Sequence, residues 1–242
     1  MSEIDRIYSQ QQRHVVDFAF DETVVKVFAD MIRRSVPGYE AILSLLSVIG
    51  SQYIRDNSKV YDIGCSLGAG LAALTAQVNL KSVQYIAVDT SSQMLEKARS
   101  NLLDFVPKEQ LLLLNQRAQD LSIEDASLVL MNFTLQFVEP DDRMDVIQKV
   151  YHGLNPGGVL VLSEKWHYES SRVDQDLTDL HHRFKALNGY SDLEISQKRT
   201  AIENVMITDS RDKQEKRLYK AGFNTVFPWF QCLNFGSLIA IK

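Results

Sequence analysis

Residues 60–70 read VYDIGCSLGAG. The stretch is a short apolar run that contains Asp62 and is followed by glycines at positions 64, 68 and 70. Glycines this close behind a strand let a ligand approach the backbone, because no side chain stands in the way. The stretch therefore predicts a buried strand, a binding loop and the start of a helix.

The hydrophobic pattern on either side extends this unit into an alternation of strands and helices. Apolar residues recur at helical spacing between Asp21 and Tyr53, ahead of the first strand. The strands expected after them are 59–64, 82–89, 110–115, 127–133 and 159–164. Two more strands are expected at the C-terminus, with a turn near 231–234, and Pro228 requires an edge strand or a bulge there.

This order of elements predicts an α/β fold and a single domain over residues 1–242. Its sheet is doubly wound, mostly parallel and seven-stranded, and it ends in an antiparallel hairpin. The expected parts are an N-terminal arm with helices (1–57), a cofactor-binding core (58–165), a helical insertion (166–221) and a terminal hairpin (222–242). Residues 1–20 show no periodicity and are expected to form a loosely ordered arm.

Composition narrows the class of partner. The net charge is −5, whereas nucleic-acid-binding proteins usually carry a basic excess. A small-molecule substrate is therefore expected, without direct nucleic-acid binding. No run of about 18 apolar residues occurs and the N-terminus is polar, so no membrane span or signal peptide is expected. Two cysteines, Cys65 and Cys232, provide no disulfide framework, which favours the reducing cytoplasm.

Three kinds of ligand are candidates for the glycine loop: a dinucleotide, a nucleotide bound by a P-loop, and S-adenosylmethionine. GAGLAA (68–73) fits the dinucleotide pattern but begins four residues too far behind the strand, and no P-loop lysine follows. S-adenosylmethionine needs an acid at the end of the second strand to accept both ribose hydroxyls, and Asp89 stands there. The alternative role for Asp89 is a helix cap, but Thr90 with Gln93 forms an expected capping box. The pattern therefore favours S-adenosylmethionine.

Several motifs resemble a known superfamily, and longer ones resemble a single family within it. VYDIGCSLGAG, IAVDTS (86–91), MNFTLQF (131–137) and LNPGG (154–158) follow in the order of the class I S-adenosylmethionine-dependent methyltransferase fold. FDETVVKVFADMIRRSVPGYE (20–40), NGYSDLEISQKR (188–199) and WFQCLNFGSLIA (229–240) resemble the carboxy-S-adenosyl-L-methionine synthase family. The resemblance spans nearly the whole chain.

The resemblance implies a reaction that makes a modified cofactor. The family converts S-adenosylmethionine and prephenate to carboxy-S-adenosylmethionine and phenylpyruvate, and it uses no metal. The product supplies a separate enzyme that carboxymethylates a wobble uridine in tRNA. A sulfonium makes its methyl hydrogens acidic, and the resulting ylide can capture carbon dioxide where water is excluded. Prephenate supplies that carbon dioxide as it aromatises, and the departing hydroxide serves as the base.

The resemblance also implies the residues of the site. The expected cofactor-binding residues are Tyr39, Gly64, Cys65, Ser66, Asp89, Thr90, Arg117, Ala118, Asn132 and Arg199. Gly64, Cys65 and Ser66 would line the amino-acid part of the cofactor, and Asp89 would hold the ribose. Arg199 would bind the new carboxylate and is the expected catalytic residue, because its planar fork suits two carboxylate oxygens.

One position departs from the family pattern. The family tends to carry an acid where Arg117 stands, and a guanidinium offers no acceptor to the adenine amino group. Backbone contacts at Arg117 and Ala118, or an acceptor from Asp120, are the alternatives. Cys65 has no histidine nearby in the sequence, so a thiol that lines the pocket is expected in place of a nucleophile.

Other polar residues have simpler explanations than catalysis. His181 and His182 are adjacent, so on a helix they point about 100° apart and a surface or interface role is expected. Arg33 and Arg34 are either anchors for the two carboxylates of prephenate or a solvated helix end.

Two other functions remain open at this point. A small-molecule methyltransferase would need a side-chain base, and a cofactor-binding regulatory module would bind without turnover. A homodimer is expected, with Leu and Phe residues of the insertion forming its face.

Overall fold

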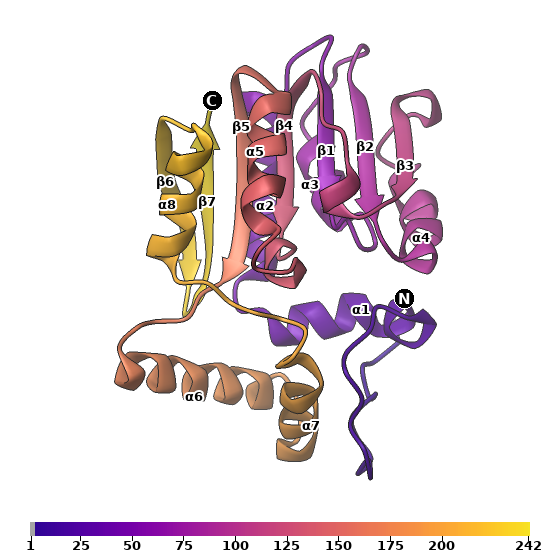
Figure 1. Cartoon of the computed structure of the whole chain (residues 1–242). Coiled ribbons are helices and arrows are strands. Elements are labelled where there is room, and N and C mark those ends of the chain that lie inside the picture. Colours follow the sequence, from indigo (N-terminus) through magenta and orange to yellow (C-terminus); the bar gives the residue numbers. More distant parts are fainter. Residues whose placement is uncertain (1–2) are drawn as a thin grey trace.

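The computed structural model describes residues 3–242 and contains a seven-stranded sheet in the order β3-β2-β1-β4-β5-β7-β6 (Figure 1). The strands are β1 (Lys59–Ile63), β2 (Gln84–Asp89), β3 (Leu111–Asn115), β4 (Ala126–Asn132), β5 (Leu154–Lys165), β6 (Thr225–Cys232) and β7 (Phe235–Ile241). Strands β1 to β5 are parallel, and β7 runs antiparallel to both β5 and β6. The predicted fold class is confirmed.

Helices cover both faces of this sheet, as its continuous apolar strands require. The helices are α1 (Glu22–Ser35), α2 (Tyr39–Tyr53), α3 (Ala69–Thr75), α4 (Ser92–Leu102), α5 (Arg143–Gly153), α6 (Ser171–Leu187), α7 (Asp192–Ile202) and α8 (Arg211–Ala221). One core joins α2, α3 and α4 to the first face, and a second joins α5 and α8 to the other. β1 and β4 are buried on both faces, so they fix the middle of the molecule.

The strand order reverses beside β1, because β2 lies on one side of it and β4 on the other. In open α/β sheets, ligands bind outside the carboxyl ends of the strands at such a switch point. The arrowheads of β1 to β5 point toward α1, α6 and α7, which lie beyond this edge (Figure 1). The fold thus leaves three helices to close a site over the strand ends.

The C-terminal hairpin follows its prediction closely. Pro228 lies on β6, which is the edge strand, and the register shifts between Pro228 and Phe230. The start of β5 does not follow its prediction: the strand expected from 159 begins at Leu154, so NPGG (155–158) lies within it. Gly157 accommodates the irregularity there with a φ of 76°, a value that favours glycine.

The N-terminal arm is packed, which corrects the expectation of a loose arm. Asp5 is 1% exposed, and Tyr8 and Phe18 are also buried. The backbone N–H of Phe18 donates to the carbonyl of Ala201 at 2.8 Å, and the Gln197 amide donates to two carbonyls of the arm. These contacts to α7 hold the arm in place of regular secondary structure, so its apolar residues show neither helical nor strand spacing.

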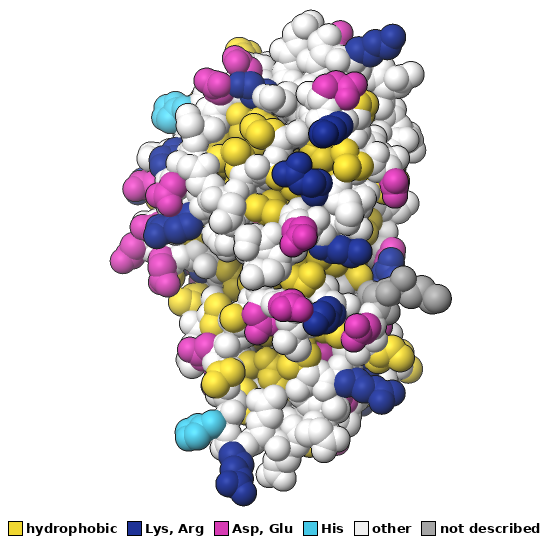
Figure 2. Space-filling model, turned by 90° about the vertical axis from the view of Figure 1, so that its right-hand side faces the viewer, with side chains coloured by type: hydrophobic (Ala, Val, Ile, Leu, Met, Phe, Trp, Pro, Cys, Tyr) yellow, Lys and Arg dark blue, Asp and Glu magenta, His cyan; other side chains and the backbone are white. Residues whose placement is uncertain are grey.

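Figure 2 shows the side of the molecule on which β3 and α4 lie in Figure 1. Hydrophobic side chains are interspersed there with acidic and basic ones, so this face carries no field of a single sign. Within residues 3–242, no helix combines the length and the apolarity that crossing a membrane requires.

Candidate active site

A cavity of about 720 Å³ opens at the carboxyl ends of β1, β2 and β4. All ten residues expected from the sequence line it, although they are spread from position 39 to position 199. Residues of α1, α6 and α7 line its other side. The volume lies in the range of small-molecule and cofactor sites.

The loop after β1 is held in a conformation that only small residues permit. Gly64 has a φ of 75°, and a Cβ added there would lie 2.3 Å from Oγ1 of Thr134. The N–H groups of Gly64 and Cys65 both donate to the carbonyl of Val88. Asp62 accepts a hydrogen bond from the N–H of Leu71 at the start of α3, and burial raises the pKa of Asp62 to about 7.

Asp89 lies at the end of β2 and binds two backbone groups of its own chain. Its Oδ2 accepts from the N–H of Ser66 at 2.9 Å, and its Oδ1 accepts from the N–H of Ser91 at 2.9 Å. Burial raises the pKa of Asp89, and these hydrogen bonds oppose that rise. A carboxylate offers about four acceptor positions, so two remain for a diol.

The helix after Asp89 is capped by a different residue from the one predicted. Ser91 is the N-cap of α4, and its hydroxyl accepts from the N–H of Met94. The expected capping box of Thr90 and Gln93 is wrong, because the helix starts one residue later. Thr90 lines the cavity instead.

Asn132 is the last residue of β4, and its side-chain amide oxygen is unpaired among the described residues. Its Oδ1 is buried and has no hydrogen-bond partner among the described residues. The same is true of Oδ1 of Asn234, which also lines the cavity. Buried polar atoms are almost always paired, so these two acceptors fit a ligand that brings donors.

Tyr39 and Cys65 are buried side chains of the cavity wall. Tyr39 is 7% exposed and Cys65 is 5% exposed. Burial raises the pKa of both groups, with the nearby Asp62 charge adding to it. A buried neutral thiol is a poor nucleophile, which agrees with a lining role for Cys65.

Arg117 and Ala118 line the cavity beyond β3, as expected for the base-binding side. Arg117 Nε lies 3.5 Å from Oδ2 of Asp120, and both side chains are exposed. Asp120 is not among the lining residues, so it is not placed to substitute for the family's acid. Of the two alternatives, the backbone groups at 117 and 118 therefore remain.

Arg199 reaches the cavity from α7 of its own chain. Within residues 3–242 its guanidinium forms no ion pair, although the side chain is exposed. His181 of α6 also lines the cavity and is 6% exposed, which corrects its expected surface position. Burial, and then the positive charges of Lys165 and Lys185, lower the pKa of His181 to about 2, so the ring is neutral.

Arg33 and Arg34 both lie in α1 but make different contacts. Arg33 borders the cavity and forms an ion pair with Glu40 at 2.5 Å. Arg34 points elsewhere: it donates to the carbonyl of Asn188 at 2.7 Å and pairs with Asp30 at 3.0 Å. Arg34 is therefore a structural residue and not a substrate anchor.

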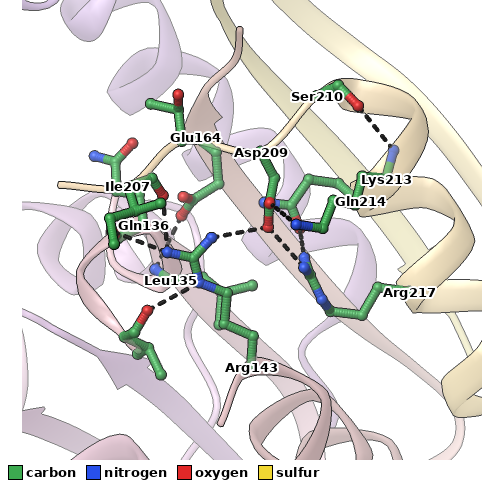
Figure 3. A network of polar contacts seen from close by, with 12 residues as sticks. Leu135, Gln136, Arg143, Glu164, Ile207, Asp209, Ser210, Lys213, Gln214 and Arg217 are labelled. Atoms are coloured by element: carbon green, nitrogen blue, oxygen red, sulfur yellow. Dashed lines mark hydrogen bonds and ion pairs between the residues drawn. The ribbon is translucent and has the colours of Figure 1, made fainter. Parts of the chain in front are cut away.

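A buried network holds the loop after β4 in place (Figure 3). Arg143 is fully buried, and its guanidinium donates to the carbonyls of Gln136 and Ile207 and to Oδ2 of Asp209 at 2.8 Å. Glu164 accepts from the N–H of Leu135, and burial raises its pKa to about 8 despite the Arg143 charge. The network joins the cavity loop at 135–137 to the end of the insertion.

Several cations that line the cavity were not predictable as a group from the sequence. Lys165, Lys185 and Lys198 line the cavity together with Arg199. Lys165 ends β5, and its place at the carboxyl edge of the sheet was the available signal. Lys185 and Lys198 carry no such signal, because lysines on helices usually face solvent.

Comparison with known proteins places these features in a family. A model described as a methyltransferase domain matches residues 60–158. The carboxy-S-adenosyl-L-methionine synthase of Shigella boydii is 46% identical over 242 residues, which is 100% of this chain and 98% of the relative. The synthase of Actinobacillus pleuropneumoniae is 46% identical over 98% of this chain and 99% of its own. The chain belongs to the carboxy-S-adenosyl-L-methionine synthase family.

Solved structures agree with this synthase family at the level of the fold. An O-methyltransferase family protein from Burkholderia thailandensis has a TM-score of 0.64 at 14% identity, covering 92% of this chain and 60% of that one. Human N-acetylserotonin methyltransferase, solved with S-adenosylmethionine, has a TM-score of 0.56 at 14% identity, covering 91% and 54%. This synthase family member is therefore an enzyme with the class I methyltransferase fold.

The residues present fit S-adenosylmethionine as a ligand of this synthase fold. The free acceptor positions of Asp89 suit a ribose diol, and the unpaired Oδ1 of Asn132 suits a donor or a positively charged group. Phe18, Phe20, Phe28 and Phe137 form an edge-to-face aromatic wall, with Phe20 at its centre. Such a wall limits access of water to the cavity.

Proposed function

We propose that this chain converts S-adenosylmethionine and prephenate to carboxy-S-adenosylmethionine and phenylpyruvate. The observation that carries the proposal is a cavity, in a synthase family member, whose lining combines acceptors for the cofactor with several cations. Asp89 and Asn132 contribute acidic and neutral acceptors to its lining, and Arg199 and three lysines contribute cations. Four cations suit an anionic substrate better than an uncharged methyl acceptor.

The proposed reaction balances without an outside oxidant or base. Prephenate loses its ring carboxylate as carbon dioxide and its ring hydroxyl as hydroxide, and aromatises to phenylpyruvate. The hydroxide removes one proton from the sulfonium methyl group and leaves as water. The methyl carbon then forms a bond to carbon dioxide, so the cofactor gains a carboxylate.

The protein itself would position the cofactor and shield the carbanion from water. The loop at 64–66 and Asp89 would fix the cofactor, and the aromatic wall would exclude the water that competes for the carbanion. Arg199 would stabilise the carboxylate as it forms. Tyr39 and Cys65 are neutral at physiological pH because burial raises the pKa of each, so neither supplies charge to the reaction.

Three further features belong to this proposal. The product would pass to a tRNA carboxymethyltransferase in the cytoplasm, and the synthase itself would not bind tRNA. The chain would act as a homodimer. It would also behave as one cooperative unit, with the parts 1–57, 58–165, 166–221 and 222–242.

The test is direct. Protein purified without added cofactor is denatured, and the released ligand is weighed. A ligand heavier than S-adenosylmethionine by one carbon dioxide unit supports the proposal. Incubation with S-adenosylmethionine and prephenate should then produce phenylpyruvate. Methyl transfer to a small acceptor, with prephenate untouched, would favour a plain methyltransferase, and binding without turnover would favour a regulatory module.

A further inference from the structure

Three lysines bring positive charge into the interior on the side of the cavity away from Asp89. Lys185 of α6 is 8% exposed and Lys198 of α7 is 7% exposed, while Lys165 at the end of β5 is half-buried. All three line the cavity. Lysines are almost never this buried unless they are paired.

Only one of the three has protein partners for its charge. Nζ of Lys198 donates to Oγ of Ser35 at 3.1 Å and lies 3.9 Å from Oδ2 of Asp5. Among residues 3–242, Nζ of Lys165 and Nζ of Lys185 form no hydrogen bond and no ion pair. Lys165 feels the charge of Asp174 at longer range, and its Nζ lies 5.8 Å from the centre of the Phe235 ring.

The surroundings compensate these two charges only in part, through Asp174 for Lys165 and Asp5 for Lys185 at longer range. His181 is neutral, and its Nε2 donates to the carbonyl of Ser35 at 2.7 Å, so it neutralises nothing. Its ring packs against Phe235 at 4.9 Å, the same ring that Lys165 faces. Burial, and then repulsion from Lys198 and Lys165, lower the pKa of Lys185 to about 7. Keeping both ammonium groups charged in the ligand-free protein therefore costs stability.

A bound anion would remove that cost. The two lysines come from different elements, β5 and α6, so they offer donors from separate directions. Lys198 would lose its ion pair with Asp5 if it bound the same anion. Arg199, on the same side of the cavity, remains for the carboxylate that the reaction creates.

We infer that Lys165 and Lys185 form the binding subsite for the dicarboxylate substrate, each ammonium holding one of its carboxylates. This inference rests on the proposed function, and it assigns the second substrate to residues that the cofactor does not need. Loss of one carboxylate during the reaction leaves one lysine unpaired again, which favours release of the monocarboxylate product.

The test separates binding from turnover. Calorimetry measures prephenate binding to protein saturated with S-adenosylhomocysteine, which has no sulfonium methyl and cannot react. The variants are Lys165→Met and Lys185→Met, which keep the length of the side chain. Arg183→Met is the control, because Arg183 lies on the same helix, is exposed, and does not line the cavity.

Each lysine variant should raise the prephenate Kd at least about tenfold, as expected for a lost charged hydrogen bond. Its Kd for S-adenosylhomocysteine should stay unchanged, and Arg183→Met should match the wild type in both. Phenylpyruvate should bind the wild type more weakly than prephenate does. The ligand-free Lys185→Met protein should melt at the wild-type temperature or above it, because an unpaired buried charge is gone.

Two outcomes would overturn the inference. Unchanged prephenate affinity in both lysine variants would do so, even if carboxy-S-adenosylmethionine is made. A lower melting temperature for Lys185→Met, with cofactor affinity lost as well, would show a structural lysine. If the wild type binds prephenate through these lysines but forms no carboxylated cofactor, the subsite stands and the proposed function fails.

Discussion

Arg199 brings positive charge to the cavity from a helix outside the sheet. The loop at 64–66 and Asp89 lie at strand ends, and we expect them to hold a cofactor that lacks the extra carboxylate. A carboxylate on the sulfonium methyl adds one negative charge and two coplanar acceptors, which a guanidinium matches better than an ammonium. Arg199 is therefore expected to distinguish the product from its precursor.

Arg199→Ala should weaken binding of carboxy-S-adenosylmethionine by roughly 2–3 kcal/mol, the value of a lost charged hydrogen-bond pair. Ordinary S-adenosylmethionine should change by well under about 1 kcal/mol, because it never makes the contact. Arg199→Lys should fall between the two. Calorimetry with both cofactors at one salt concentration checks this, and equal losses for both would mean that Arg199 supports the pocket generally.

Lys185 should make stability depend on pH. Its pKa falls from 10.5 to about 7 in the folded protein, with burial as the main cause, then Lys198 and Lys165, while Asp5 opposes the shift. His181 and His182 face the same region, but their pKa values are lowered as well. Between pH 7 and pH 10.5 the unfolded chain binds the additional proton, so this residue makes stability rise with pH.

The ligand-free Lys185→Met protein lacks this group. Its advantage in melting temperature over the wild type should be largest near pH 6 and should shrink toward pH 9. Thermal melts at several pH values, with Arg183→Met as the reference, test it. A difference that stays constant with pH would mean that Lys185 has the same pKa in the folded and unfolded protein, so its burial does not lower the pKa.

Single residues differ in how far their roles can be predicted from the sequence. Asp89 was identifiable because an acid stands where the second strand ends, and the cavity was expected there. The burial of Lys185 was not predictable, because a helical pattern does not indicate that a lysine on the helix is buried. Ser91 and Thr90 are both good caps, and only the backbone decides between them.

At the scale of elements, the connection between the insertion and the core depends on Asp209. Its carboxylate accepts from Arg143, Arg217 and Lys213 (Figure 3). Burial alone would raise the pKa of Asp209, but these hydrogen bonds lower it to about 2. The carboxylate thus joins α5, α8 and the segment before α8.

Asp209→Asn should lower the free energy of unfolding by about 3–5 kcal/mol, because buried cations lose their counter-charge. The matched control is Asp212→Asn, which removes an exposed pair with Lys216 and should cost about 1 kcal/mol or less. Urea unfolding followed by circular dichroism measures both. Equal effects would contradict the role given to this network.

Elements with caps and a clear period were predictable. The helix over Arg211–Ala221 lies within the predicted helical insertion, where Ser210 caps it and Gly222 ends it. The start of β5 was missed because Asn, Pro and Gly normally end a strand, whereas β5 carries them with a register shift. The packing of residues 3–20 could not be inferred, since it depends on α7, far along the chain.

At the scale of the whole molecule, α6 exposes an apolar row. Val173, Leu180 and Leu187 lie seven residues apart and are 40%, 49% and 85% exposed. Residues at this spacing share one face of a helix. This row is the surface on which the proposed homodimer is expected to form.

Leu180→Glu should shift the mass in solution from twice 27.5 kDa toward 27.5 kDa. A charge in the middle of an apolar interface is costly to bury. Leu45→Glu on α2, which is 42% exposed, should leave the mass unchanged. Light scattering after gel filtration decides, and an unchanged mass for Leu180→Glu would place the interface elsewhere.

The class of fold was predictable from the order of strands and helices, because parallel sheets need helices between their strands. The cavity was only partly predictable. Gly64 and Asp89 follow strands directly, but Phe18, His181 and Lys185 meet them only because the N-terminal arm and the insertion fold back over the strand ends.

The central claim is that the ring carboxylate of prephenate becomes the carboxylate of the cofactor. Prephenate labelled with ¹³C at that carboxylate is mixed with S-adenosylmethionine and the purified protein, and the cofactor pool is analysed by mass spectrometry. The proposed function predicts a cofactor heavier by one labelled carbon dioxide unit, formed in step with phenylpyruvate. An unlabelled carboxylated cofactor, or a methylated product with prephenate intact, would contradict it.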